Sequence, residues 1–284
     1  MSRITARRRV TAVDATHPGG VGRIDTVAME EPLEIRLGGA PYTVTMRTPG
    51  HDVELAQGLL NAEGIITRLE DVATARYCAG SVMDDETGQP ANTYNVLDIR
   101  LAAGVVVPAG RVRRAVTSSA CGVCGTESID LLRTQTRFDL AADDVRVRAE
   151  TLLAMPDALR EAQKVFSATG GLHGVALFTA QGEMLVARED VGRHNATDKV
   201  IGWAMQHGRY PATGCVLFVS GRTSFELAQK AAMAGVPVLA GISAPSSLAV
   251  DVAEELGITL AGFVRGDRMN LYAHPERIVL PESS

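Results

Sequence analysis

Apolar and polar residues alternate strictly in several short segments of the first half of the chain, and this alternation predicts strands. It covers Leu33–Leu37, after which Gly38-Gly39 turns the chain into a partner strand at Tyr42–Met46. A third alternating segment, Leu97–Leu101, follows a polar stretch over residues 84–95 that is expected to be a loop. Roughly the first 25 residues are polar and rich in Gly and Arg, which predicts a mobile opening stretch.

One helix is expected among these strands. Thr48 and Pro49 suit an N-cap and a first helical position, and Gly64 is a suitable stop. The apolar residues between them fall on one helical face: Val53, Ala56, Leu59 and Leu60. This half of the chain is therefore predicted to mix antiparallel strands with a helix.

The pattern changes near residue 150, where longer apolar strands begin to alternate with helices. Continuous apolar runs predict buried strands at Cys215–Val219, Val236–Ala240 and Ile258–Val264, with helices between them at Phe225–Ala234 and Leu248–Leu256. Such runs are typical of a parallel sheet that helices cover on both faces. Because crossover connections are right-handed, the loops after all three strands are expected at one edge of the sheet.

The other elements of this half precede those strands. A helix is expected over Leu152–Phe166, strands over Val175–Thr179 and Glu183–Arg188, and a second helix over Ala196–Met205. The change of pattern predicts two parts: a mixed α+β region over residues 1–145 and an α/β domain over residues 146–284.

Composition narrows the function classes. The 284 residues are 46% hydrophobic, enough for a sizeable core, and the net charge of -5 argues against a protein that coats nucleic acid. The sequence shows no signal peptide and no apolar run of about 20 residues, the length that spans a bilayer. Four cysteines are too few for a disulfide scaffold in a chain of this length. A reducing, cytoplasmic location is expected.

Three loops are predicted at the carboxyl edge of the parallel sheet, where ligands of open α/β folds bind. They are Ser220-Gly221-Arg222-Thr223-Ser224, Ser243–Ser247 and Arg265–Asn270. The first two lead into helices, whose N-terminal N–H groups favour anions, and Arg222, Arg265 and Arg268 add guanidinium groups. Helix capping alone also explains the Ser and Thr residues. Neither G-x-G-x-x-G nor G-x-x-x-x-G-K-[ST] is present, which argues against a Rossmann dehydrogenase and a P-loop NTPase.

Two cysteines, Cys121 and Cys124, stand three residues apart between glycines and before a predicted helix at Thr126–Leu132. A helix N-terminus lowers the pKa of a thiol and so increases the fraction of nucleophilic thiolate. Sulfur exchange, a structural zinc site and thioredoxin-type redox chemistry all use such pairs. Zinc normally needs four ligands, and Cys78 and Cys215 are isolated residues that we expect to pack as small apolar side chains.

One histidine stands close to a pattern that zinc-dependent deaminases use. His173 follows Gly170-Gly171 and precedes an apolar strand, but Val175 stands where a zinc-dependent deaminase needs glutamate, which argues against that chemistry.

A charged segment follows the strand predicted at Glu183–Arg188. Glu189 and Asp190 are explained by a solvated helix start, whereas Arg193, His194 and Asn195 together suggest ligand binding or acid–base chemistry.

Six segments in order carry a resemblance to a known family. They are Thr48–Ala56 with Glu63–Ile66, Ser119–Gly125, Thr169–His173, Arg188–Lys199, Ser220–Glu226 and Gly262–Asn270. Together they resemble the formate dehydrogenase accessory sulfurtransferase family, written FdhD, over nearly the whole chain.

The resemblance implies a cytidine-deaminase-like α/β fold without deamination, and a homodimer. It implies a sulfur carrier that takes sulfur from a cysteine desulfurase and passes it to the molybdenum bis-guanine-dinucleotide cofactor of formate dehydrogenase. Cys121 would bear the persulfide, with Cys124 as its partner. The implied cofactor-binding segment is Phe263, Val264, Arg265, Gly266, Asp267 and Arg268. Ser220, Gly221, Arg222, Thr223, Ser224, Arg193 and His194 are further candidates, and no metal ligands are expected. The alternative is a cofactor-binding chaperone whose cysteines transfer no sulfur.

Overall fold

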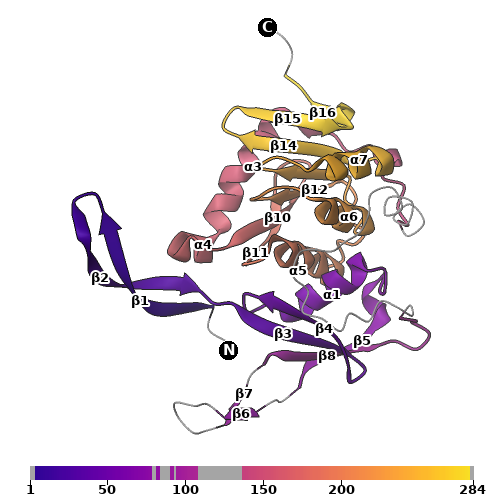
Figure 1. Ribbon diagram of the computed structural model, residues 1–284. Coiled ribbons are helices and arrows are strands. Elements are labelled where there is room, and N and C mark those ends of the chain that lie inside the picture. The colour runs from indigo at the N-terminus through magenta and orange to yellow at the C-terminus, as the bar shows by residue number, and fades with distance from the viewer. Residues whose placement is uncertain (1–3, 79–80, 84–89, 93, 108–135, 282–284) are drawn as a thin grey trace.

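The computed structural model describes residues 4–78, 81–83, 90–92, 94–107 and 136–281. Two larger sheets and a projecting two-stranded arm make up the molecule (Figure 1). The structure thus has the mixed α/β composition that the sequence predicts. The division into residues 1–145 and 146–284 stays a prediction.

A six-stranded sheet forms the centre of the second half, in the order β11-β10-β12-β13-β14-β15. Its strands are β10 (His173–Thr179), β11 (Met184–Asp190), β12 (Cys215–Val219), β13 (Val238–Gly241), β14 (Thr259–Arg265) and β15 (Arg268–Ala273). Strands β12, β13 and β14 are parallel, which confirms the prediction for the three apolar runs. The other three strands pair antiparallel with their neighbours.

Helices cover both faces of this sheet, also as predicted. They are α3 (Ala149–Ala162), α4 (Lys164–Thr169), α5 (Arg193–Gln206), α6 (Phe225–Met233) and α7 (Ser247–Leu256). Side chains of α5, α6 and α7 share one hydrophobic cluster with the sheet, and those of α3 share another on the opposite face. Successive side chains of a strand point to opposite faces, so the continuous apolar runs supply both clusters.

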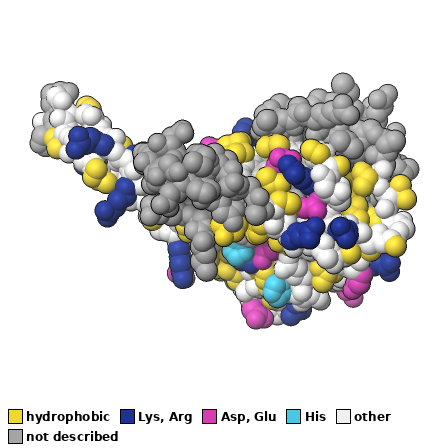
Figure 2. All heavy atoms as spheres, turned by 90° about the horizontal axis from the view of Figure 1, so that it is seen from below, with side chains coloured by type: hydrophobic (Ala, Val, Ile, Leu, Met, Phe, Trp, Pro, Cys, Tyr) yellow, Lys and Arg dark blue, Asp and Glu magenta, His cyan; other side chains and the backbone are white. Residues whose placement is uncertain are grey.

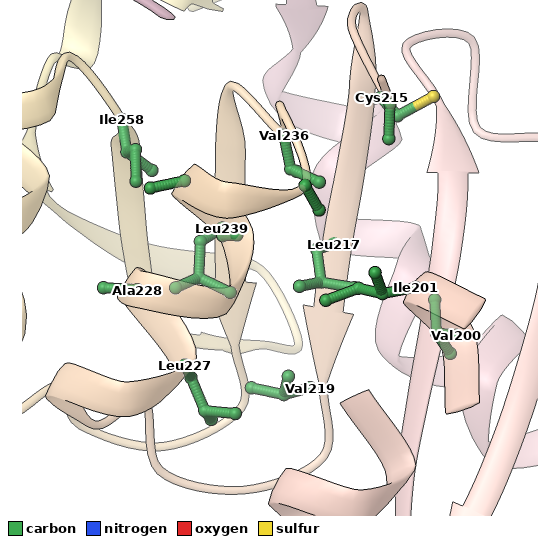
Figure 3. Packing of buried hydrophobic residues seen from close by; sticks show 14 of the residues in the cluster. Val200, Ile201, Cys215, Leu217, Val219, Leu227, Ala228, Val236, Leu239 and Ile258 are labelled. Atoms are coloured by element: carbon green, nitrogen blue, oxygen red, sulfur yellow. The ribbon is translucent and has the colours of Figure 1, made fainter. Parts of the chain in front are cut away.

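Figure 3 shows the larger cluster from close by. Leu217 of β12 lies next to Ile201 of α5, Val219 lies next to Leu227 of α6, and Cys215 lies at the start of β12. Cys215 is buried, as expected for a small apolar residue, and burial raises the pKa of its thiol. This cysteine is therefore part of the core.

A four-stranded sheet in the first half packs on helix α1 (Asp52–Ala62) in the order β4-β3-β8-β5. Its strands are β3 (Glu31–Leu37), β4 (Ala40–Arg47), β5 (Val72–Tyr77) and β8 (Val96–Leu101). The hairpin predicted around Gly38-Gly39 is confirmed by the β3–β4 pairing.

The predicted start of the first helix was wrong. Helix α1 begins at Asp52, with His51 as its N-cap in the left-handed conformation at φ 58°. Thr48 lies four positions before the first helical residue and is not the N-cap, and its hydroxyl accepts a hydrogen bond from the Val191 amide at 3.1 Å. Thr48 therefore connects the first half of the chain to the end of β11.

Helices α1 and α5 cross at two glycines. A Cβ added to Gly58 would lie 2.0 Å from the carbonyl oxygen of Asp198, and one added to Gly202 would lie 1.9 Å from that of Glu54. Real Cβ atoms do not approach backbone oxygens so closely, so glycine at both positions permits the backbones to touch. In Figure 1 α1 accordingly lies directly against α5.

The mobile opening stretch predicted for the N-terminal region was also wrong. Residues Thr5–Asp14 (β1) and His17–Ala28 (β2) form a long antiparallel hairpin that projects from the rest of the molecule (Figure 1). Both faces of the arm are largely exposed, so its sequence lacks the alternation of a half-buried strand. Hydrophobic and basic side chains both appear on the arm in Figure 2. Three apolar residues of the arm, Val13, Val21 and Ile24, are each more than half exposed.

Short elements complete the fold: η1 (Leu69–Asp71), β6 (Ser81–Met83), β7 (Pro90–Asn92), η2 (Leu140–Ala142), β9 (Val147–Arg148), η3 (Pro275–Arg277) and β16 (Ile278–Val279). Strand β7 pairs with β6 and lies inside the stretch over residues 84–95 that the sequence predicts as a loop. That prediction was therefore wrong for Pro90–Asn92, because pairing with a second short segment is not visible in local polarity.

Candidate functional site

A cavity of about 550 Å³ opens at the carboxyl edge of the parallel strands. Ser220 follows β12, Ile242 follows β13, and Arg265 and Gly266 lie at the end of β14. The predicted edge therefore does bring together residues from three strand ends. The remaining lining comes from the start of β10 and from α3 and α4: Pro156, Asp157, Arg160, Gln163, Phe166, Gly170, Gly171, Leu172 and His173. A cavity of this size suits a nucleotide-sized ligand.

The wall formed by α3 and α4 presents a flat cationic surface. The guanidinium carbon of Arg160 lies 4.2 Å from the centroid of the Phe166 ring. Gln163 is 3% exposed, and its amide nitrogen has no hydrogen-bond partner. A Cβ at Gly174 would lie 2.5 Å from Gln163, so the glycine makes room for this side chain. The wall thus offers a stacking surface and an unused hydrogen-bond donor.

Sequence reasoning missed this wall. Arg160 and Asp157 lie on the exposed side of an amphipathic helix, where polar residues need no functional explanation. Gln163 and Phe166 stand at the junction between α3 and α4 and carry no motif. Only the packing of these helices beside the strand ends identifies them as cavity residues.

The floor of the cavity joins β10 to the end of β12. The Ser220 hydroxyl accepts a hydrogen bond from the Gly174 amide at 2.9 Å, and the Ser220 amide donates to the Gly174 carbonyl at 2.9 Å. His173 stands beside them, and a Cβ at Gly221 would lie 3.4 Å from its Nδ1. Burial is the main cause that lowers the pKa of His173, and the nearby positive charge of Arg193 lowers it further.

The predicted segment Phe263–Arg268 contributes only in part. Arg265 and Gly266 line the cavity, and the Arg265 guanidinium lies 5.6 Å from the centroid of the Phe263 ring. Phe263 has a φ of 52°. Val264 is fully buried in the core on the α3 face, so its side chain is structural.

The loop predicted over Arg265–Asn270 was wrong in extent. Gly266 and Asp267 form a tight turn, and Arg268 already belongs to β15, which pairs back onto β14. Gly266, at φ 61°, allows the turn to be this short. Asp267 and Arg268 are exposed on it and are not among the cavity residues.

A second group of predicted residues lies where helices α5 and α6 begin. His194 Nε2 is 2.9 Å from Glu226 Oε2 and 3.2 Å from the Ser224 hydroxyl. The hydrogen bond from His194 lowers the pKa of Glu226 despite its partial burial. Ser224 is the N-cap of α6, but its hydroxyl caps no helix N–H, in contrast to Ser246, which accepts from the Ala249 amide at the start of α7. Capping thus explains Ser246 and leaves Ser224 for another role.

Three residues near this group have structural roles, and the prediction of a solvated helix start was wrong. Asp190 is fully buried and its carboxylate accepts from Lys199 Nζ at 2.7 Å, because a charge without water needs an opposite charge. Glu189 accepts hydrogen bonds from the first amides of α4. Asn195 donates to the Met46 carbonyl at 2.7 Å and so joins α5 to β4.

The cysteine pair, Cys121 and Cys124, lies outside the described residues. Cys78 is partly buried beside β5. Among the residues that the structure describes, no group of three or more His, Cys, Asp or Glu side chains could hold a metal ion. No helix in the described part of the chain is long and apolar enough to cross a membrane.

Comparison with known proteins places the chain in a family. Residues 28–279 match the model of the FdhD/NarQ family. A protein from Mycolicibacterium paratuberculosis named "Sulfur carrier protein FdhD" is 59% identical over 276 residues, covering 97% of this chain and 99% of that protein. A protein of the same name from Nocardia farcinica is 55% identical over 276 residues, which cover 97% of this chain and 95% of that protein.

A solved structure agrees with the fold. It belongs to a candidate formate dehydrogenase accessory protein from Desulfotalea psychrophila, with a TM-score of 0.74 and 22% identity. The match covers 98% of this chain and 100% of that one. The order of the six segments, the extent of the family match and the identities above agree, and the chain belongs to the FdhD/NarQ family.

Proposed function

We propose that this protein is a sulfur carrier that passes sulfur from a cysteine desulfurase to a molybdenum bis-guanine-dinucleotide cofactor destined for formate dehydrogenase. In the first step the Cys121 thiolate attacks the terminal sulfur of the desulfurase persulfide. A new S–S bond forms at Cys121, the S–S bond of the donor breaks, and the donor cysteine leaves as a thiolate. No external oxidant or reductant is needed for this exchange.

The observation that carries the proposal is the cavity at the carboxyl edge of the sheet, in a chain of this family. Its Arg160–Phe166 pair offers a surface on which a flat base can stack. Arg265 adds a second guanidinium at the end of β14. A cargo that combines guanine bases with phosphates needs both kinds of group, because stacking holds the base and guanidinium groups bind phosphate.

The partners follow from the same proposal. The donor is a cysteine desulfurase, the recipient is formate dehydrogenase, and the protein acts as a homodimer in the cytoplasm. Cys124 is the second thiol of the transfer pair. Within the predicted segments Phe263–Arg268 and Ser220–Ser224, Arg265, Gly266 and Ser220 line the cavity that would hold the cargo. Arg193 and His194 lie beside it at the start of α5.

The experiment that tests the proposal follows the sulfur. The protein is mixed with a cysteine desulfurase and [35S]cysteine, and label that a thiol reductant releases is counted as persulfide. We expect Cys121→Ala to lose nearly all of this label. Cys78→Ala is the matched control, because it removes a cysteine from outside the pair, and it should label like the parent protein.

The outcomes separate two functions. Loss of label in Cys121→Ala alone supports sulfur transfer through this residue. If Cys121→Ala is labelled as fast as the parent, the transfer role of Cys121 is wrong. A cofactor-binding chaperone without sulfur transfer then becomes the better description.

A further inference from the structure

The β1–β2 arm begins beside the cavity. At its base β2 lies against α4, which forms part of the cavity wall. A Cβ added to Gly171, a residue that lines the cavity, would lie 3.9 Å from the Cβ of Ala28, the last residue of β2. From there the arm extends away from the body (Figure 1), and its strands reach roughly 30 Å. A protein bound along the arm is therefore held close to the cavity.

Both faces of the arm are largely exposed. The relative exposures of Val13, Val21 and Ile24 are 66%, 53% and 59%. A two-stranded hairpin without cover is at best marginally stable in water, and apolar residues gathered on an exposed surface mark interaction sites. The arm therefore has the properties of a docking surface.

The charge of the arm is opposite in sign to that of the whole chain. Residues 5–28 contain four arginines and two aspartates, a net charge of +2, whereas the chain carries -5. One of these aspartates, Asp25, is paired with Arg23 at 3.4 Å. No acidic side chain in the described part of the protein forms an ion pair with Arg7–Arg9. Three neighbouring guanidinium groups are thus available to the carboxylates of another molecule.

The register of the hairpin places two of these arginines beside an apolar residue. Cross-strand partners share a face, and Arg9 is the partner of Ile24. Arg7 stands two positions before Arg9 and therefore points to the same side, whereas Arg8 points to the other side and donates to the Arg7 carbonyl. Alternate residues of a strand lie about 7 Å apart. Two acidic residues with this spacing on an extended segment would match Arg7 and Arg9.

We propose that the basic face of the arm, formed by Arg7, Arg9 and Ile24, docks an acidic, extended segment of the protein that receives the cargo. The inference rests on the proposed function, in which formate dehydrogenase is the recipient, and adds the surface that binds it. The arm suits this partner because its base contacts the cavity wall, so a recipient held on the arm stands beside the cargo. Pairing between the arms of two copies is disfavoured, because it would bring unpaired arginines together.

Surface plasmon resonance between the full chain and formate dehydrogenase that lacks its molybdenum cofactor tests the docking surface. The arm variant Arg7→Glu/Arg9→Glu reverses both charges of the basic face and should weaken binding roughly tenfold or more at about 0.15 M salt. The matched control is Arg146→Glu/Arg148→Glu, which makes the same change of charge at two exposed arginines with the same spacing, just before α3. This control should bind like the parent.

A second variant, Ile24→Ser, separates the apolar contact from the charges. It should weaken binding roughly 5- to 20-fold and leave the salt dependence of the affinity unchanged. The arm variant should reduce that salt dependence, because the contribution of exposed arginines is screened by salt. Thermal unfolding of both variants checks that the body of the protein is intact, and Ile24→Ser decides the question if the charge reversal disturbs the hairpin.

Three results overturn the docking surface. The first is a parent that does not bind, or an arm variant and Ile24→Ser that both bind as tightly as the parent. The second is loss of persulfide label from the desulfurase in the arm variant, since the arm would then dock the sulfur donor. The third is a dimeric parent with a monomeric arm variant in light scattering, since the arm would then join two copies of this chain.

The docking surface and the proposed function fail separately. Labelling with sulfur needs only the desulfurase, so the arm variant should label like the parent. If Cys121→Ala is labelled as fast as the parent while the arm variant loses affinity for formate dehydrogenase, the docking surface stands and sulfur transfer through Cys121 is wrong. If Cys121→Ala loses its label while the arm variant and Ile24→Ser bind formate dehydrogenase like the parent, sulfur transfer stands and the docking surface is wrong.

Discussion

The ion pair between Glu54 and Arg188 joins helix α1 of the first half to strand β11 of the second. Arg188 donates from Nε to one carboxylate oxygen at 2.6 Å and from a terminal nitrogen to the other at 2.8 Å. The side chains of Arg188 and Glu54 are only 16% and 10% exposed. Glu54→Gln keeps the shape of the side chain and removes its charge. It therefore measures the contribution of the Glu54 carboxylate to both of its partners, Arg188 and His51, whose Nδ1 lies 3.4 Å away.

The expected loss of stability follows from the pKa of the Glu54 carboxyl group. Burial alone would raise the pKa of Glu54, but the hydrogen bonds and charges of Arg188 and His51 lower it from 4.5 to about 2. At about 1.36 kcal/mol for each pH unit the upper limit is roughly 3.4 kcal/mol, which solvent screening reduces to about 2 kcal/mol. Because the folded-state pKa is depressed, this stability is present above about pH 5 and is lost as the pH falls toward 2.

Urea unfolding of the parent and Glu54→Gln at pH 7 and pH 3 measures the effect. We expect the variant to be about 2 kcal/mol less stable at pH 7 and the difference to fall by roughly half at pH 3. Glu183→Gln, which removes an exposed carboxylate near the start of β11, should change stability by less than about 0.5 kcal/mol. A difference between parent and Glu54→Gln that is the same at both pH values would refute the reasoning.

Two other substitutions probe the packing between the halves. Gly202→Ala places a Cβ against the Glu54 carbonyl and should cost about 3 kcal/mol in urea unfolding, whereas Gly22→Ala, in open space on the arm, should be nearly neutral. Lys199→Met leaves a buried carboxylate without its cation and should lower the free energy of unfolding by about 3–5 kcal/mol. Its control Lys164→Met, at an exposed position, should stay within about 0.5 kcal/mol of the parent, and equal effects of the two Lys variants would contradict the argument.

The elements with strong local patterns could be predicted from the sequence. Strand β12 coincides with the apolar run Cys215–Val219, because a parallel strand buried on both faces has no polar positions. Helices α6 and α7 lie within a residue of their predicted limits, since their apolar faces recur at the helical period. The β3–β4 hairpin followed from Gly38-Gly39, which suits a tight turn.

The candidate site could be predicted only in outline. The right-handed crossover rule places Ser220 and Gly266 at one edge, and both line the cavity. The sequence around Val264 does not show that its side chain belongs to the core, and the sequence around Arg268 does not show that it begins another strand. The roles of Cys121 and Cys124 rest on the family resemblance and stay predictions.

The sequence by itself determined the family and the order of strands and helices in the second half, because motifs and hydrophobic periods are local properties of a chain. Only the tertiary structure decided which charges are buried and which donors converge. From the sequence alone Asp190 is expected to be solvated. In the structure its carboxylate accepts hydrogen bonds from Lys199 and from the amide of Thr48, which lies 142 positions away. The arm is stabilised by pairing between two exposed strands, and the wall of the cavity comes from helices beside it. Such features depend on contacts between distant segments, whose geometry no single stretch of sequence encodes.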